Sequence, residues 1–129
     1  MDTLQKYAHY FSTLNRATVK GEKAPHKIIM LLAVIDLVAQ GHISSPDIVL
    51  DDRLKQLFNM LWARYVGESS VFSSVVRTPF IHLDYEPFWE LRQIAPRQPL
   101  CATLSDKLYN LLNDENNRAY FRRLLISLI

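Results

Sequence analysis

The feature that most constrains this fold is a run of apolar residues in the first third of the chain. Eleven of the twelve residues from 28 to 39 are apolar, and Asp36 is the exception. A helix that is apolar on nearly every side must be packed on nearly every side. The run is too short to cross a bilayer, which takes about 20 residues. Pro25 before it and Gly41 after it suit the start and the end of a helix. The sequence therefore predicts a buried central helix surrounded by other helices.

Composition and length predict one globular domain over residues 1–129. With 49% hydrophobic and 22% charged residues, the chain is long enough to bury a core of its own. Cys101 is the only cysteine, which excludes an intrachain disulfide and a cysteine-based zinc site. The first residues lack the apolar core of a signal peptide. We therefore expect a soluble, cytoplasmic protein with no membrane partner.

Helical spacing of apolar residues predicts further helices around the central one. Asp2 or Thr3 can cap the first of them and Asp51 can cap the third, while Asp114 and Glu115 lie near the start of the last. The expected helices cover residues 3–15 and 52–66, with two more between Leu104 and the C-terminus. The central helix is expected to have Pro25 near its first turn and to run to about residue 40.

Strands are expected in only two places. A short apolar run at residues 48–50 predicts a brief strand, and residues 80–83 with 88–92 predict a small antiparallel hairpin. Residues 16–24 and the segment from Pro96 through Arg97 to Pro99 are expected to form loops. The predicted fold class is mainly α with a small antiparallel β-sheet, an α+β domain.

One segment of the chain concentrates positive charge. Residues 16–27 carry a net charge of +3, whereas the rest of the chain sums to −1. The free amides at the start of the central helix would lie among these cations, which favours an anion-binding site. A local cationic patch of this kind indicates a phosphate-containing partner. The alternative is that Lys20 and Lys23 are only solvated loop charges. The cations of the segment are Arg16, Lys20, Lys23 and Lys27.

Catalytic patterns are weak. The four histidines are far apart and form no metal-binding motif, so no metal, cofactor or catalytic residue is predicted. Asp84, Glu86 and Glu90 with Arg92 resemble the acidic residues of one nuclease class without its usual lysine, and a turn followed by a strand explains them equally well. Cys101 falls in an expected loop without a nearby histidine, which disfavours a nucleophile. A binding module is expected rather than an enzyme.

Several stretches, in order along nearly the whole chain, resemble one known family. The most specific are residues 24–27, Ala-Pro-His-Lys, and residues 79–83, Pro-Phe-Ile-His-Leu, followed by Phe88-Trp89. They are similar to the DNA sulfur-binding domain of McrA-type, phosphorothioate-dependent HNH restriction endonucleases. In that family the domain recognises DNA in which sulfur replaces a non-bridging phosphate oxygen, and a separate HNH domain cuts. We expect no nuclease domain within residues 1–129.

The resemblance implies a sulfur cavity and a set of cationic contacts around it. Its partner would be double-stranded DNA with Rp phosphorothioate linkages, and a nuclease domain or subunit would act with it. A guanine base would be read by an arginine, whose fork matches O6 and N7. The sulfur cavity would be lined by His26, Lys27, Thr78, Pro79 and His82. Of these, His26 and Lys27 would also hold the charged oxygens of the linkage. The phosphates and base edges would be contacted by Arg16, Lys20, Lys23 and Arg77.

Two cavity positions depart from the family pattern. Relatives often carry an aromatic residue where this chain has Thr78, and many carry an arginine where it has Lys27, which exchanges a forked contact for a point charge. The residues themselves leave other roles open. His82 can be a core histidine bonded to backbone, and Pro79 can be an edge-strand proline. The alternative functions are a generic DNA-binding module without sulfur preference and a nuclease subunit.

Overall fold

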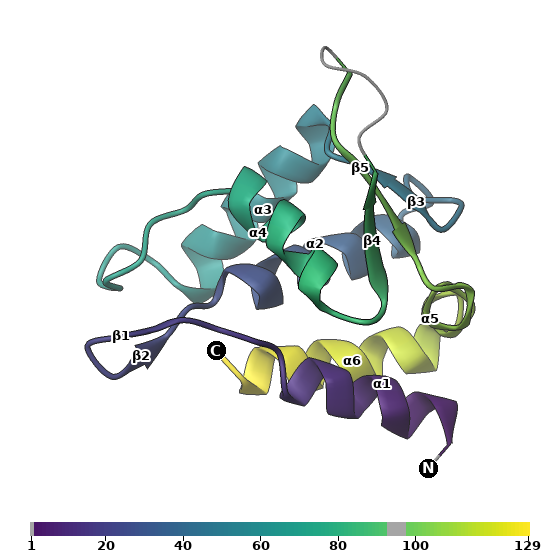
Figure 1. Ribbon diagram of the computed structural model, residues 1–129, viewed down its shortest axis with the longest axis horizontal. Helices are drawn as coiled ribbons and strands as arrows, with labels where there is room; N and C mark the ends of the chain where they lie inside the picture. The colour runs from purple at the N-terminus through teal and green to yellow at the C-terminus, as the bar shows by residue number, and fades with distance from the viewer. Residues whose placement is uncertain (1, 93–97) are drawn as a thin grey trace.

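The central helix predicted from the apolar run is the core of the fold. The computed structural model describes residues 2–92 and 98–129, and in it α2 spans His26–Ala39 (Figure 1). From Lys27 to Val38 every residue of α2 is buried except Asp36, whose carboxylate accepts a hydrogen bond from the Arg122 guanidinium. Helices α3, α4 and α6 pack around α2. The predicted buried helix is therefore confirmed.

The flanking helices begin at capping residues that the sequence indicates. Asp2 accepts a hydrogen bond from the backbone N–H of Gln5 at 2.8 Å, and Asp51 accepts one from that of Leu54 at 2.9 Å. Helix α6 packs against α2, and α1 lies alongside α6 at the lower edge of Figure 1. Three boundaries differ from the prediction: α1 ends before residue 15, α3 ends one residue before residue 66, and α5 begins after Leu104. The bounds are α1 Thr3–Ser12, α3 Asp52–Tyr65, α5 Asp106–Leu112 and α6 Glu115–Ser127.

The predicted hairpin between residues 80–83 and 88–92 is wrong. Its first segment belongs to helix α4 (Arg77–His82) and to the 3₁₀ helix η1 (Leu83–Tyr85). Phe80 and Leu83 are both buried, and their spacing of three residues turns both toward the core in a helix, whereas in a strand they would face opposite sides. Pro79 lies in the first turn of α4, where its missing N–H is tolerated.

The strand predicted at residues 48–50 is confirmed as β3 (Asp47–Val49), and it belongs to a three-stranded antiparallel sheet. The central strand of that sheet, β5 (Cys101–Leu104), pairs with β3 on one side and with β4 (Trp89–Arg92) on the other. Cys101, which was expected in a loop, is a buried residue of this strand. The predicted loop at Pro96 and Arg97 lies outside the described residues.

The expected loop at residues 16–24 contains a second, smaller sheet. Strand β1 (Thr18–Val19) pairs antiparallel with β2 (Glu22–Lys23). The two turn residues, Lys20 and Gly21, have φ angles of 52° and 77°. Positive φ at both central positions is the geometry of two-residue hairpin turns. The hairpin projects from the left side of Figure 1, next to the N-terminus of α2.

Together these elements form a mainly helical α+β domain with two small antiparallel sheets, which is the predicted fold class. Across the part of the chain that the structure describes, no helix has the length and apolar character needed to span a membrane.

Candidate functional site

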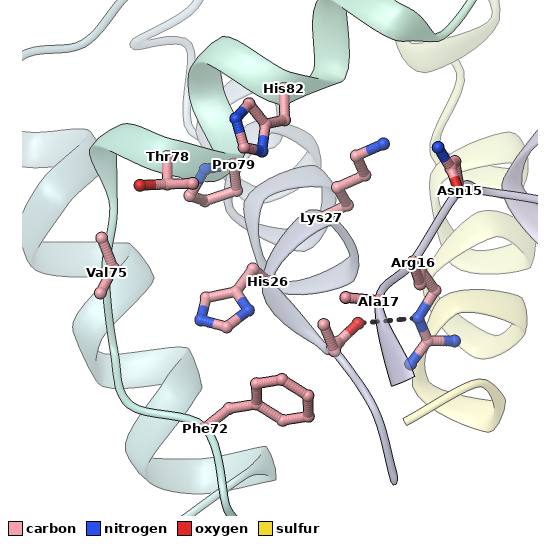
Figure 2. Close-up of a pocket in the computed structure, with 11 residues that line it drawn as sticks. Asn15, Arg16, Ala17, His26, Lys27, Phe72, Val75, Thr78, Pro79 and His82 are labelled. Carbon is pink, nitrogen blue, oxygen red and sulfur yellow. Dashed lines mark hydrogen bonds between the residues drawn. The ribbon is translucent and has the colours of Figure 1, made fainter. Parts of the chain in front are cut away.

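A cavity of about 310 Å³ opens between the N-terminus of α2 and helix α4 (Figure 2). Its walls come from three parts of the chain: the segment after α1, the start of α2, and the stretch that runs from the loop after α3 into α4. Most of the lining is carbon. The lining residues are Asn15, Arg16, Ala17, Ala24, His26, Lys27, Phe72, Val75, Thr78, Pro79 and His82.

The five residues predicted to line a sulfur cavity all line this one. His26 and Lys27 come from the first turn of α2, and Thr78, Pro79 and His82 come from α4, which packs on α2. Thr78 and His82 are one helical turn apart and therefore share a face of α4. Pro79 is buried within a helix, so it is not an edge-strand proline. His82 is exposed, so it is not a core histidine.

His26 lines the cavity and is held by two aromatic rings and a backbone carbonyl. Its ring lies 4.6 Å from the ring of Trp62 and 5.7 Å from that of Phe72, measured between centroids. Nε2 lies 2.9 Å from the carbonyl oxygen of Ser73, and because a carbonyl only accepts, Nε2 must carry the proton. Burial lowers the pKa of His26, and the bond to Ser73 only partly offsets this effect. His26 is therefore neutral at pH 7, with Nδ1 as an acceptor.

Lys27 is buried and already has a carboxylate partner. Its Nζ lies 3.6 Å from Oε1 of Glu86, and the two side chains are 10% and 9% exposed. The same Oε1 accepts a hydrogen bond from the backbone N–H of Asn15 at 3.1 Å. Figure 2 shows the Lys27 side chain extending between His82 and Asn15 at the edge of the cavity. The positive charge of Lys27 is thus balanced within the protein.

Arg16 lines the cavity, but its guanidinium donates hydrogen bonds to backbone carbonyls. Its Nε donates to the carbonyl of Ala24 at 2.8 Å, the dashed line in Figure 2, and Nη1 donates to that of Leu128 at 3.1 Å. Burial lowers the pKa of Arg16, yet a guanidinium stays charged at pH 7. Arg16 therefore contributes a fixed positive charge while it ties the segment after α1 to the C-terminal residues.

The other three predicted cations do not line the cavity. Lys20 is exposed at the turn of the β1–β2 hairpin. Lys23 borders a separate cavity of about 290 Å³ to which Arg16 also contributes. Arg77, although adjacent to Thr78, is exposed and borders a third cavity together with Asp51 and Lys55. These side chains can therefore contact only those parts of a large ligand that extend beyond the cavity.

One cavity wall was not predicted. Phe72 and Val75 line it from the loop that joins α3 to α4. This loop is fastened to the β1–β2 hairpin, because the Ser70 hydroxyl donates to Oε1 of Glu22 at 2.6 Å. It is fastened to α3 as well, because the Ser74 hydroxyl donates to Oδ1 of Asn59 at 2.7 Å. Two apolar residues among serines in an irregular segment were the only sequence signal for this wall.

The carboxylates of the alternative nuclease pattern have structural partners. Asp84 accepts a hydrogen bond from the backbone N–H of Leu91 at 2.8 Å, and Glu86 holds Lys27. Glu90 lies 3.7 Å from Arg92, with both side chains largely exposed. Among residues 2–92 and 98–129, no group of three or more His, Cys, Asp or Glu side chains is arranged to hold a metal ion.

No protein-family model matches the chain, and neither does any curated protein. A largely apolar lining beside two cationic side chains and a helix N-terminus suits a group that is anionic and partly apolar at once.

Proposed function

We propose that this domain is a non-enzymatic reader of phosphorothioate-modified double-stranded DNA. One observation carries the proposal: the residues implied by the resemblance, His26 and Lys27 on α2 with Thr78, Pro79 and His82 on α4, converge on a single cavity. Their convergence could not be assumed from the sequence, because α2 and α4 are separated by α3 and the loop after it.

The chemistry of sulfur explains why an apolar wall suits such a ligand. A phosphorothioate keeps its negative charge, but its sulfur is larger and accepts hydrogen bonds more weakly than oxygen. Ordinary phosphate oxygen would lose its hydration against Pro79, Val75 and Phe72 without an equivalent gain, whereas sulfur loses less. The wall therefore favours sulfur by penalising oxygen.

The anionic part of the linkage would be held at the start of α2. No side chain caps this helix, so its first N–H groups remain available to an anion. Arg16 adds a fixed positive charge beside them. Lys20, Lys23 and Arg77 would contact neighbouring phosphates, and an arginine would be the residue to read guanine. Cleavage would fall to a nuclease domain or subunit acting with this one, in the cytoplasm.

The test is a titration of one short duplex with and without a single Rp phosphorothioate, at two salt concentrations. We expect tighter binding to the modified duplex, with log affinity falling against log salt by about 0.9 per neutralised phosphate. Equal affinities for the two duplexes would refute sulfur recognition and leave a generic DNA-binding module. Metal-dependent cleavage of either duplex would instead identify a nuclease.

A further inference from the structure

We infer that Glu86 sets the selectivity of this cavity by holding the Lys27 ammonium away from an ordinary phosphate oxygen. The inference rests on the proposed function. Glu86 does not line the cavity and is not among the residues that the resemblance implies.

The geometry fixes Glu86 in its position beside Lys27. Glu86 directly follows η1, and its backbone N–H donates to the carbonyl of Leu83 at 2.8 Å. Its carboxylate accepts from the backbone N–H of Asn15 at 3.1 Å and lies 3.6 Å from Nζ of Lys27. Three separate parts of the chain therefore meet at this carboxylate, so it is positioned by the fold and not by a flexible surface contact.

Burial makes this ion pair matter for binding. Exposed pairs contribute little because water screens them, but the side chains of Lys27 and Glu86 are only 10% and 9% exposed. A buried ammonium needs a partner, and here the partner is supplied before any ligand arrives. An entering anion meets a lysine whose positive charge is already balanced by Glu86, and it is also repelled by the Glu86 carboxylate.

The pair acts differently on oxygen and on sulfur. A free ammonium would give a phosphate oxygen a strong, charge-assisted hydrogen bond and so compensate the hydration lost against the apolar wall. Sulfur is the weaker acceptor and would gain less from the same ammonium. Because Glu86 holds Lys27, a phosphate oxygen does not receive the hydrogen bond that would offset its lost hydration. The apolar wall therefore still disfavours oxygen relative to sulfur.

Glu86→Gln is the direct test, because glutamine keeps the size of the side chain and an oxygen that can accept from Asn15. In this variant the best remaining partner for Lys27 is the anion in the cavity. We expect affinity for the unmodified duplex to rise about tenfold, the gain of one hydrogen bond to a charged group. The modified duplex should gain less, about threefold, so that the preference for sulfur falls. The salt slope on the unmodified duplex should steepen by about one.

Two companion variants separate this role from general electrostatics. Glu90→Gln removes the same charge from an exposed position four residues further along the chain and should leave the ratio of the two affinities unchanged. On a Lys27→Gln background, Glu86→Gln should no longer raise affinity for the unmodified duplex. An equal gain with and without Lys27 would overturn the inference, since Glu86 would then act by repulsion alone.

The failure of the inference is distinguishable from the failure of the proposed function. Equal wild-type affinities for the two duplexes refute sulfur recognition. Unchanged affinities and salt slope in a folded Glu86→Gln variant refute the role of Glu86 alone. If thermal unfolding indicates that this variant does not fold, Glu86→Asp replaces it, because a shorter carboxylate keeps the charge but loosens its hold on Lys27. Glu86→Asp should then move the ratio in the same direction by a smaller factor, and an unchanged ratio would refute the inference.

Discussion

Replacing Pro79 with alanine should lower the preference for phosphorothioate without weakening binding to ordinary DNA. Pro79 is buried, lines the cavity and occupies the first turn of α4. Proline has no backbone N–H, so replacing it with alanine removes no hydrogen bond from the helix. Glycine would be a poorer choice, because it would also destabilise the helix.

The magnitude follows from the atoms removed. Alanine lacks the two ring methylenes Cγ and Cδ, and each buried methylene contributes about 0.8 kcal/mol. If both contact the sulfur, the loss is at most about 1.6 kcal/mol, or about fifteenfold in affinity for the modified duplex. A phosphate oxygen gains nothing from an apolar ring, so affinity for the unmodified duplex should stay within about twofold.

The assay is a fluorescence anisotropy titration of both duplexes at one salt concentration, with thermal unfolding as a check on folding. Pro46→Ala is the matched control, because Pro46 lies beside the three-stranded sheet and not among the residues that line the cavity. It should change neither affinity. An equal loss on both duplexes for Pro79→Ala, or no loss on either, would refute the role of Pro79 as a wall against sulfur.

Two further predictions concern charge and stability. Lys23→Ala should weaken binding to both duplexes alike and flatten the salt slope by about one, because Lys23 is exposed on the β1–β2 hairpin and borders the smaller cavity of about 290 Å³. An unchanged slope would mean that Lys23 does not contact phosphate. Asp51→Ala should lower the free energy of unfolding by about 1–2 kcal/mol, because Asp51 caps α3, as urea unfolding would measure. Burial raises the pKa of Asp51, but the hydrogen bonds from Leu54 and His42 outweigh it and the pKa is lowered. A carboxyl whose pKa is lowered by folding stabilises fully above its unfolded value, about 3.9. That stabilisation should be lost as the pH falls through the folded pKa. A variant that shows the same acid sensitivity as the wild type below about pH 4 would contradict this account.

The central helix and the caps could be predicted because their signals are local. The apolar run of α2 is long and is bounded by Pro25 and Gly41, and Asp2 and Asp51 cap helices at the positions their side chains favour. Segment 80–83 was wrongly predicted as a strand because a run of four apolar or aromatic residues is too short for hydrophobic periodicity to distinguish a strand from a helix. Its helical state depends on tertiary contacts such as the hydrogen bond from the Trp89 indole to the Phe80 carbonyl at 2.9 Å.

The residue types of the cavity could be proposed from the sequence, but their electrostatic state could not. The motif around His26 gave no indication that its ring is held by Ser73 and flanked by two aromatic rings. The partner of Lys27 lies far along the chain at Glu86, and no spacing rule connects them. Arg16 reads as a free phosphate contact in the sequence, yet in the fold its donors serve backbone carbonyls.

The two sides of the cavity differ in how they are anchored. One side is the start of α2, which cannot shift without disturbing the whole core. The other includes a short irregular connection carrying Phe72 and Val75, fastened by a few polar bonds to its surroundings. A library confined to Phe72 and Val75, with Ser70 and Ser74 kept, would therefore vary the apolar wall while it preserves the bonds that position this connection.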